Sequence, residues 1–129
     1  MNEDLRRLLP ATKYEVEKAE ALVSLGHERV LSVMPAVLEW TQDSNWPVAQ
    51  VLQPFLAAIG SPLAPFVREI LVEGDDVWKY FLLLHVVAKS TDLANSLRDD
   101  LERLVTNPTD GEVKEEVSLV AKEILDALN

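Results

Sequence analysis

The sequence predicts an all-α protein with about six or seven helices, arranged as an α-α superhelix of HEAT-like repeats. Three observations support this prediction. Apolar residues recur at helical spacing along nearly the whole chain, no segment alternates with period two over a useful length, and one apolar helical pattern recurs after a glycine. The recurrence relates residues 21–38 to residues 55–67, and self-similarity at such a period is typical of stacked helix pairs.

Length and composition favour one domain that covers residues 1–129. Hydrophobic residues make up 48% of the chain, which is enough to build a core. Twelve basic and 22 acidic side chains give a formal net charge of −10. Because a nucleic-acid partner requires cations that displace counterions from phosphates, we expect none. We also expect no membrane partner, since the same charge repels an anionic lipid surface.

Cysteine usage and the N-terminal residues bear on the compartment. The absence of cysteine suits a reducing cytosol and leaves no thiolate ligand for a metal. The segment from Met1 to Asp4 contains acids and lacks the basic stretch of a secretory signal. The longest apolar run, residues 80–88, is interrupted by His85 and is far shorter than the ~20 residues that cross a bilayer. We therefore predict a cytoplasmic protein.

The first predicted unit spans residues 12–44. Thr12 and Glu15 have the T-x-x-E spacing of a capping box, in which each side chain bonds the free amide of the other residue. The first helix would end before Gly26, which suits a C-terminal cap. A second helix follows, and Pro35 must lie in its first turn or at a bend, because proline lacks the amide hydrogen.

The second predicted unit spans residues 46–74. Pro47 suits an early helical position, where the missing amide hydrogen costs little. Gly60 would end the first helix of this unit. The apolar stripe of that helix is expected to face the core and contains Val48, Val51, Leu52, Phe55, Leu56 and Ile59.

The third predicted unit spans residues 75–106. Asp75 or Asp76 is expected to cap its first helix, where a carboxylate is favoured by the free amides and the helix dipole. The alternative for this acidic pair is a metal ligand or a general base. Residues 77–88 are apolar nearly all round, which predicts a helix packed on several sides.

A capping helix over residues 110–128 completes the predicted fold. Thr109 and Glu112 have the spacing of a second capping box at its start. One face of this helix is apolar and the other is polar. A polar outer face is what the terminal element of a repeat stack requires.

The pattern Leu-Gly followed by V-L-x-x-M-P-A-V-L, over residues 25–38, resembles HEAT-type repeats. The segments D-S-N-W-P-V-A at residues 43–49 and D-D-V-W-K-Y at residues 75–80 look like a bacterial family of short HEAT-like proteins of unknown function. The resemblance covers roughly residues 12–106. It implies an α-α superhelix and a role in binding protein, and it implies no catalytic residues.

Motifs for catalysis are absent from the sequence. It contains no glycine-rich phosphate loop, no nucleophile elbow and no histidine spacing typical of zinc. His85 is interpreted as a histidine at the edge of the core, with a ligand or catalytic role as the alternative. We therefore expect no enzymatic activity, no cofactor and no bound metal.

Aromatic residues near helix ends provide the candidate binding site. Trp46, Trp78 and Tyr80 either wedge between helical layers or form a binding patch, because tryptophan and tyrosine are favoured interface anchors. In the second interpretation Asn45 and Lys79 supply polar contacts at the rim.

The function expected from the sequence is a non-enzymatic protein-binding module. The concave face of a helical stack would hold a peptide or a helix of the partner. The alternative is an acidic immunity or inhibitor protein that covers a basic toxin or nuclease, where opposite charge accelerates association. The expected partner is thus a protein or peptide, and it is basic in the second case.

Overall fold

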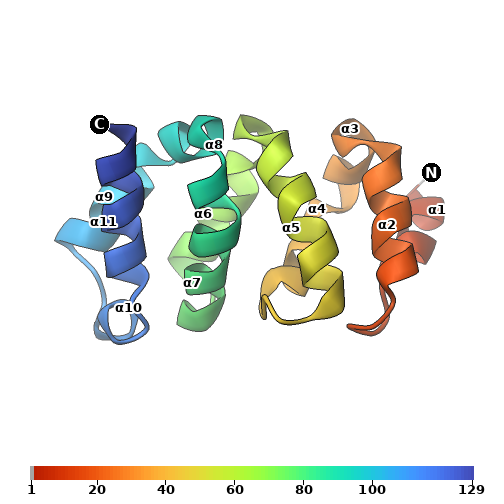
Figure 1. The fold of residues 1–129 in the computed structure, drawn as a ribbon, viewed down its shortest axis with the longest axis horizontal. Helices are drawn as coiled ribbons and strands as arrows, with labels where there is room; N and C mark the ends of the chain where they lie inside the picture. Colours follow the sequence, from red (N-terminus) through yellow and green to blue (C-terminus); the bar gives the residue numbers. More distant parts are fainter. Residues whose placement is uncertain (1) are drawn as a thin grey trace.

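The computed structural model describes residues 2–129, with side chains described from Leu5 onward, and it is helical throughout (Figure 1). No β-strand occurs within residues 2–129, which confirms the all-α class. Met1, the first residue of the predicted domain, lies outside the described residues. The described range contains eleven α-helical and four 3-10 segments, so the expected count of six or seven helices is wrong.

The helical segments follow one another with short connections. The α-helices are α1 (Asn2–Leu8), α2 (Val16–Leu25), α3 (His27–Val30), α4 (Met34–Leu38), α5 (Pro47–Ile59), α6 (Ala64–Glu73), α7 (Asp76–His85), α8 (Thr91–Ser96), α9 (Arg98–Thr106), α10 (Asp110–Lys114) and α11 (Val117–Leu128). The 3-10 segments are η1 (Leu31–Val33), η2 (Glu39–Thr41), η3 (Ser61–Leu63) and η4 (Val87–Lys89).

Proline and one left-handed residue explain two of the additional breaks. One helix was expected to follow Gly26, with Pro35 in its first turn or at a bend; Pro35 lies in the first turn of α4, so a new helix begins there. The predicted helix over residues 110–128 is split between α10 and α11 because Glu116 has φ 64° and ψ 19°. This left-handed conformation cannot continue an α-helix.

The helices stand side by side along the long axis of the molecule, with the two termini at opposite ends (Figure 1). α2, α5, α7 and α11 follow one another in this row, and each contacts the next. α4 and α6 lie behind them in the same view. The second segments of the first two predicted units therefore form a layer behind the row of first segments.

A continuous apolar core runs through the row, from Leu5 near one end to Ile124 near the other. The predicted stripe of α5 supplies four buried residues, which are Val48, Leu52, Leu56 and Ile59. Val51 and Phe55 are only partly buried against the core. Ala49 and Gln53 are buried instead, so the buried face of α5 is rotated from the predicted stripe toward these two residues.

Two corners of similar angle occur after Gly26 and Gly60. The helical pairs on either side of them, residues 16–41 and 47–73, are bent by 113° and 109°. Both glycines have positive φ, 86° and 78°, which residues with a Cβ rarely adopt. Each bent pair has, as a pair, the length and apolar composition of a membrane span, whereas no single helix within residues 2–129 does.

Asp92, in α8, forms a hydrogen bond with the corner that follows Gly60. Its Oδ2 accepts a hydrogen bond from the Ser61 backbone N–H at 2.8 Å. A Cβ added to Gly60 would lie 2.7 Å from the same oxygen, whereas a Cβ added to Gly26 would meet no atom within 4 Å. The first corner therefore requires glycine for its dihedral angles, and the second requires it also for the close approach of Asp92.

The capping residues are mostly those the sequence predicts. Asp75 caps α7 and accepts hydrogen bonds from the N–H groups of Val77 and Trp78. Thr109 and Glu112 form a complete capping box. Gly26 is the C-cap of α2.

The predicted box of Thr12 and Glu15 forms only in part. The Glu15 carboxylate accepts from the Thr12 N–H, but the Thr12 hydroxyl accepts from Tyr14 rather than from Glu15. α2 consequently begins at Val16. The Lys13 carbonyl accepts a hydrogen bond from the Val48 N–H, so the preceding turn contacts the start of α5 instead of extending the helix.

Candidate functional site

Asn45 and Trp46 lie in the turn before α5. Asn45 is exposed, and its N–H donates to the Asp43 carboxylate at 2.9 Å. Trp46 is half-buried and packs edge to face on Trp40, with 5.6 Å between the ring centroids. An edge-to-face arrangement is one that aromatic pairs favour.

Trp78 lies in the first turn of α7, directly after the Asp75 cap. Its indole Nε1 donates to the Thr41 hydroxyl oxygen at 2.9 Å, and the Thr41 hydroxyl donates to the Leu38 carbonyl at 2.6 Å. This chain of two hydrogen bonds fixes the half-buried indole against η2. Trp78 is therefore held in one orientation, although part of its ring remains exposed.

Tyr80 lies two residues further along α7 and contacts a different neighbour. Its ring packs edge to face on Phe81, at 5.5 Å between centroids. Two positions on a helix differ by about 200° in direction, so Tyr80 and Trp78 face different sides of α7. The structure consequently does not gather Trp46, Trp78 and Tyr80 into one patch of touching rings.

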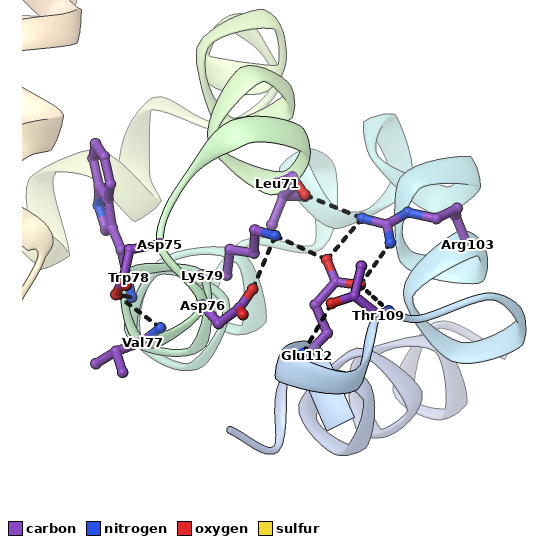
Figure 2. A network of polar contacts seen from close by, with 9 residues as sticks. All are labelled: Leu71, Asp75, Asp76, Val77, Trp78, Lys79, Arg103, Thr109 and Glu112. Atoms are coloured by element: carbon purple, nitrogen blue, oxygen red, sulfur yellow. Dashed lines mark hydrogen bonds and ion pairs between the residues drawn. The ribbon is translucent and has the colours of Figure 1, made fainter. Parts of the chain in front are cut away.

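Lys79 is only 5% exposed, and its side chain points into the protein (Figure 2). Its Nζ donates to the Glu112 carboxylate at 2.9 Å and to the Asp76 carboxylate at 3.1 Å. The sequence analysis placed Lys79 at the rim of a binding surface. The structure places it in a buried ionic network, because its position one turn into α7 faces α10 rather than solvent.

Glu112 is the centre of this network and is fully buried. Arg103 donates to both of its carboxylate oxygens, at 2.6 and 3.0 Å, and also to the Leu71 carbonyl at 3.1 Å (Figure 2). Burial alone would raise the pKa of Glu112. Hydrogen bonds from Arg103, the Thr109 N–H and Lys79 outweigh burial and lower this pKa from 4.5 to about 2.

The network ties α6, α7, α9 and α10 together. Its two cations match its two carboxylates, and Glu112 receives a donor at each oxygen. The sequence predicted the Thr109–Glu112 capping box but not the contact with Lys79, which lies 33 positions away. These ion pairs, centred on a buried carboxylate, join the helices together.

A groove lies between the second segments of the first two predicted units. It has a volume of about 270 Å³ and is lined by Pro35, Leu38, Glu39, Phe66, Glu69, Ile70 and Trp78. A smaller hollow of about 200 Å³ continues it and adds Glu73 and Gly74 to the lining. We refer to these two connected hollows as the acidic aromatic groove.

The acidic aromatic groove combines an apolar floor with unpaired carboxylates. Phe66 and Trp78 are half-buried in it, whereas Glu39, Glu69 and Glu73 are exposed. Among the residues whose side chains are described, none of these three carboxylates has an ion-pair partner. Of the five residues predicted from sequence to form the site, only Trp78 lines this groove.

The other groove residues were missed, although α6 carries a signal for them. Phe66, Glu69 and Glu73 recur at spacings of three and four, which places them on one face of a helix. Because this face of α6 carries one aromatic and two acidic residues, a search for apolar periodicity alone does not identify it as part of a site. Within the described side chains, no group of three or more His, Asp or Glu residues could hold a metal ion.

Comparison with known proteins identifies a family for most of the chain. The search of curated proteins finds no match. A family described as a domain of unknown function, DUF5071, matches residues 8–125. Because this match spans far more than half of the 129 residues, the chain belongs to the DUF5071 family.

Proposed function

We propose that this chain is a non-enzymatic protein-binding module built from HEAT-like repeats. The two corners after Gly26 and Gly60 support the repeats, since their angles of 113° and 109° are similar and each follows an amphipathic helix. The side-by-side row of α2, α5, α7 and α11 supports a superhelical stack in which each unit contacts its neighbours (Figure 1).

The acidic aromatic groove is the observation on which the binding role rests. Its apolar floor suits the aliphatic stem of a lysine or arginine side chain, and its three free carboxylates suit the charged end. The half-buried rings of Phe66 and Trp78 add a favourable contact for a cation. The partner is therefore a protein segment that presents basic side chains.

The acidic aromatic groove is also preorganised for binding. Trp78 is fixed by Thr41, so little side-chain freedom remains to be lost on binding. α4 and α6, which supply most of the lining, are second segments of their predicted units. Repeat proteins commonly use such a row of equivalent helices as a binding surface.

A peptide titration tests this role. The probe is a capped peptide of alternating arginine and leucine, and the matched peptide has glutamate in place of arginine. We expect the basic peptide to shift the NMR signal of the Trp78 indole N–H in a saturable manner. The triple substitution Glu39→Gln, Glu69→Gln and Glu73→Gln should weaken binding at least about tenfold, or about 1.4 kcal/mol.

A charge-matched control separates the groove from net charge. Glu17, Glu20 and Glu28 are exposed residues of α2 and α3 outside the groove, and their triple substitution by glutamine changes the net charge equally. This control should retain binding. Equal weakening by both triple variants would attribute binding to net charge and would reject the groove.

The alternative function is that of an acidic inhibitor covering a basic toxin or nuclease. The net charge of −10 and the carboxylates of the groove favour it. Opposite charges would then accelerate association, and the rate should fall steeply between low and physiological salt. Inhibition of a basic nuclease encoded beside this chain, at equimolar protein, would select this alternative. A neighbouring gene for a neutral, non-toxic protein would weigh against it.

A further inference from the structure

A second hollow lies on the other layer of the protein, between α5 and the end of α7. It has a volume of about 460 Å³ and is lined by Gln50, Gln53, Pro54, Ala57, His85 and Lys89. We refer to it as the donor hollow. It shares no lining residue with the acidic aromatic groove.

The donor hollow has the opposite electrostatic character to the rest of the chain. Its lining contains no carboxylate, although the chain has 22 acidic residues. Its polar side chains are an ammonium, an imidazole and two amides, all of which have N–H groups to donate. Lys89 is exposed and has no ion-pair partner among the described side chains.

Gln53 contributes an amide that the fold leaves unpaired. The residue is 9% exposed, and its Nε2 is buried without a hydrogen-bond partner among the described residues. An unpaired buried donor costs free energy, so native structures usually satisfy it. Gln53 also lines the hollow, and a rotation about its last side-chain torsion would be needed to present this nitrogen to a ligand there.

His85 forms another part of the wall of the donor hollow. Its ring stacks on Phe81, with 6.3 Å between centroids and 23° between planes. Burial lowers the pKa of His85, and the positive charge of Lys89 lowers it further. The neutral imidazole still carries one N–H group, so Lys89 supplies the permanent positive charge of the lining.

We propose that the donor hollow binds a small organic carboxylate that has an apolar body. The Lys89 ammonium pairs with the carboxylate, and the Gln53 amide donates a hydrogen bond to it. Pro54 and Ala57 contact the hydrocarbon part. One permanent cation beside an apolar wall matches a monocarboxylate better than a multiply charged anion such as phosphate.

Lys89 ends η4, which follows α7, and a cation near the C-terminal end of helical segments also interacts favourably with the helix dipole. That role affects stability, whereas the proposed role affects ligand binding. The test therefore measures both quantities for each variant.

The test is an NMR titration of the isotope-labelled chain with sodium benzoate. We expect saturable shifts of the Gln53 side-chain amide, with a dissociation constant in the millimolar range. Benzamide has the same apolar body without the charge and should give no saturable shift. Inorganic phosphate should bind more weakly than benzoate. Shifts of equal size with benzamide or sodium chloride, or tighter binding of phosphate, would overturn the proposal.

Variants of the lining complete the test. Lys89→Met should raise the dissociation constant for benzoate at least about tenfold, while Lys114→Met, an exposed lysine of α10, should leave it unchanged. Gln53→Leu removes the unpaired amide, so it should fold at least as stably and bind benzoate more weakly. Thermal unfolding of each variant establishes that it is folded. Unchanged benzoate binding in both folded lining variants would reject the proposal.

Discussion

The Lys79 ammonium lies 2.9 Å from the Glu112 carboxylate, although the two residues are 33 positions apart in the sequence. Both side chains are almost completely removed from solvent. Their contact, supported by Arg103, attaches α10 to α7 and α9 (Figure 2). Removing one partner of such a buried pair leaves the other charge uncompensated.

Glu112→Gln is therefore expected to lower the free energy of unfolding by about 3–5 kcal/mol. The substitution retains the shape of the side chain but leaves Lys79 with Asp76 as its remaining carboxylate. Urea unfolding followed by circular dichroism measures the loss. Glu102→Gln, on the exposed face of α9, is the control and should change stability by less than about 0.5 kcal/mol. A loss below about 1 kcal/mol for Glu112→Gln would show that the network contributes little.

The same carboxylate predicts a dependence of stability on pH. The pKa of Glu112 is about 2 in the folded chain and near 4.5 when unfolded, so the unfolded state binds the proton more readily. This contribution, of the order of 3 kcal/mol, is complete above about pH 5 and is lost as the pH falls toward 2. Urea unfolding at pH 6, 4 and 2.5 should show that wild type loses more stability than Glu112→Gln does. Parallel losses in the two proteins would contradict the low pKa.

The two glycine corners predict different costs for the same substitution. Gly26→Ala meets open space but retains an unfavourable positive φ, so it should cost roughly 1–3 kcal/mol. Gly60→Ala has the same strain and also displaces Asp92 from the Ser61 N–H, so its cost should be larger. Thermal unfolding of both variants, and of Asp92→Ala, gives the comparison. Equal costs at the two corners would show that Asp92 moves aside freely.

Two neighbouring residues of α5 test which face of this helix is buried. Leu56 is fully buried, and Leu56→Ala should cost about 2–5 kcal/mol. Phe55 is partly exposed, so Phe55→Ala should cost less than truncation of a fully buried phenylalanine does. Urea unfolding of both variants measures the order. A larger loss at Phe55 than at Leu56 would mean that the face of α5 is rotated from the one described.

Substitutions of Trp46 and Trp78 should affect different properties, namely stability and peptide binding. Trp46 packs on Trp40, so Trp46→Ala should reduce stability and leave binding of the arginine peptide intact in the folded protein. Trp78→Ala should weaken peptide binding by about 2 kcal/mol or more. Thr41→Val, which removes the partner of the indole N–H, should weaken binding by a smaller amount. Unchanged peptide affinity in the Trp78 and Thr41 variants would place the binding surface elsewhere.

The spacing of apolar residues and the short capping motifs predicted the helical class and several helix ends. Helical periodicity gave the all-α class, and short-range cap chemistry located Asp75 and the Thr109–Glu112 box. The breaks were harder to predict, because the left-handed Glu116 has no distinctive residue type. The count of helices failed partly for this reason, and partly because Pro35 begins a new helix and because α1 and the break between α8 and α9 were not predicted.

The candidate site depended on contacts that a single sequence does not reveal. Lys79 was placed at a rim because lysine is usually exposed, and only the approach of α10 buries it. The groove joins residues from α4, α6 and α7, so its lining follows from the packing of segments far apart in the chain. Trp78 could be anticipated because aromatic residues commonly act as anchors.

All three tryptophans, at positions 40, 46 and 78, precede the last 51 residues. Trp40 touches Trp46, and Trp78 is bonded to Thr41 in η2, so the indoles sample the junction of η2 with α5 and α7. Intrinsic fluorescence therefore reports on that junction, while α8 to α11 contribute only to the far-ultraviolet signal. Unfolding curves that coincide by both methods would show that the two regions unfold as one cooperative unit. Curves that separate would give the order in which the regions come apart.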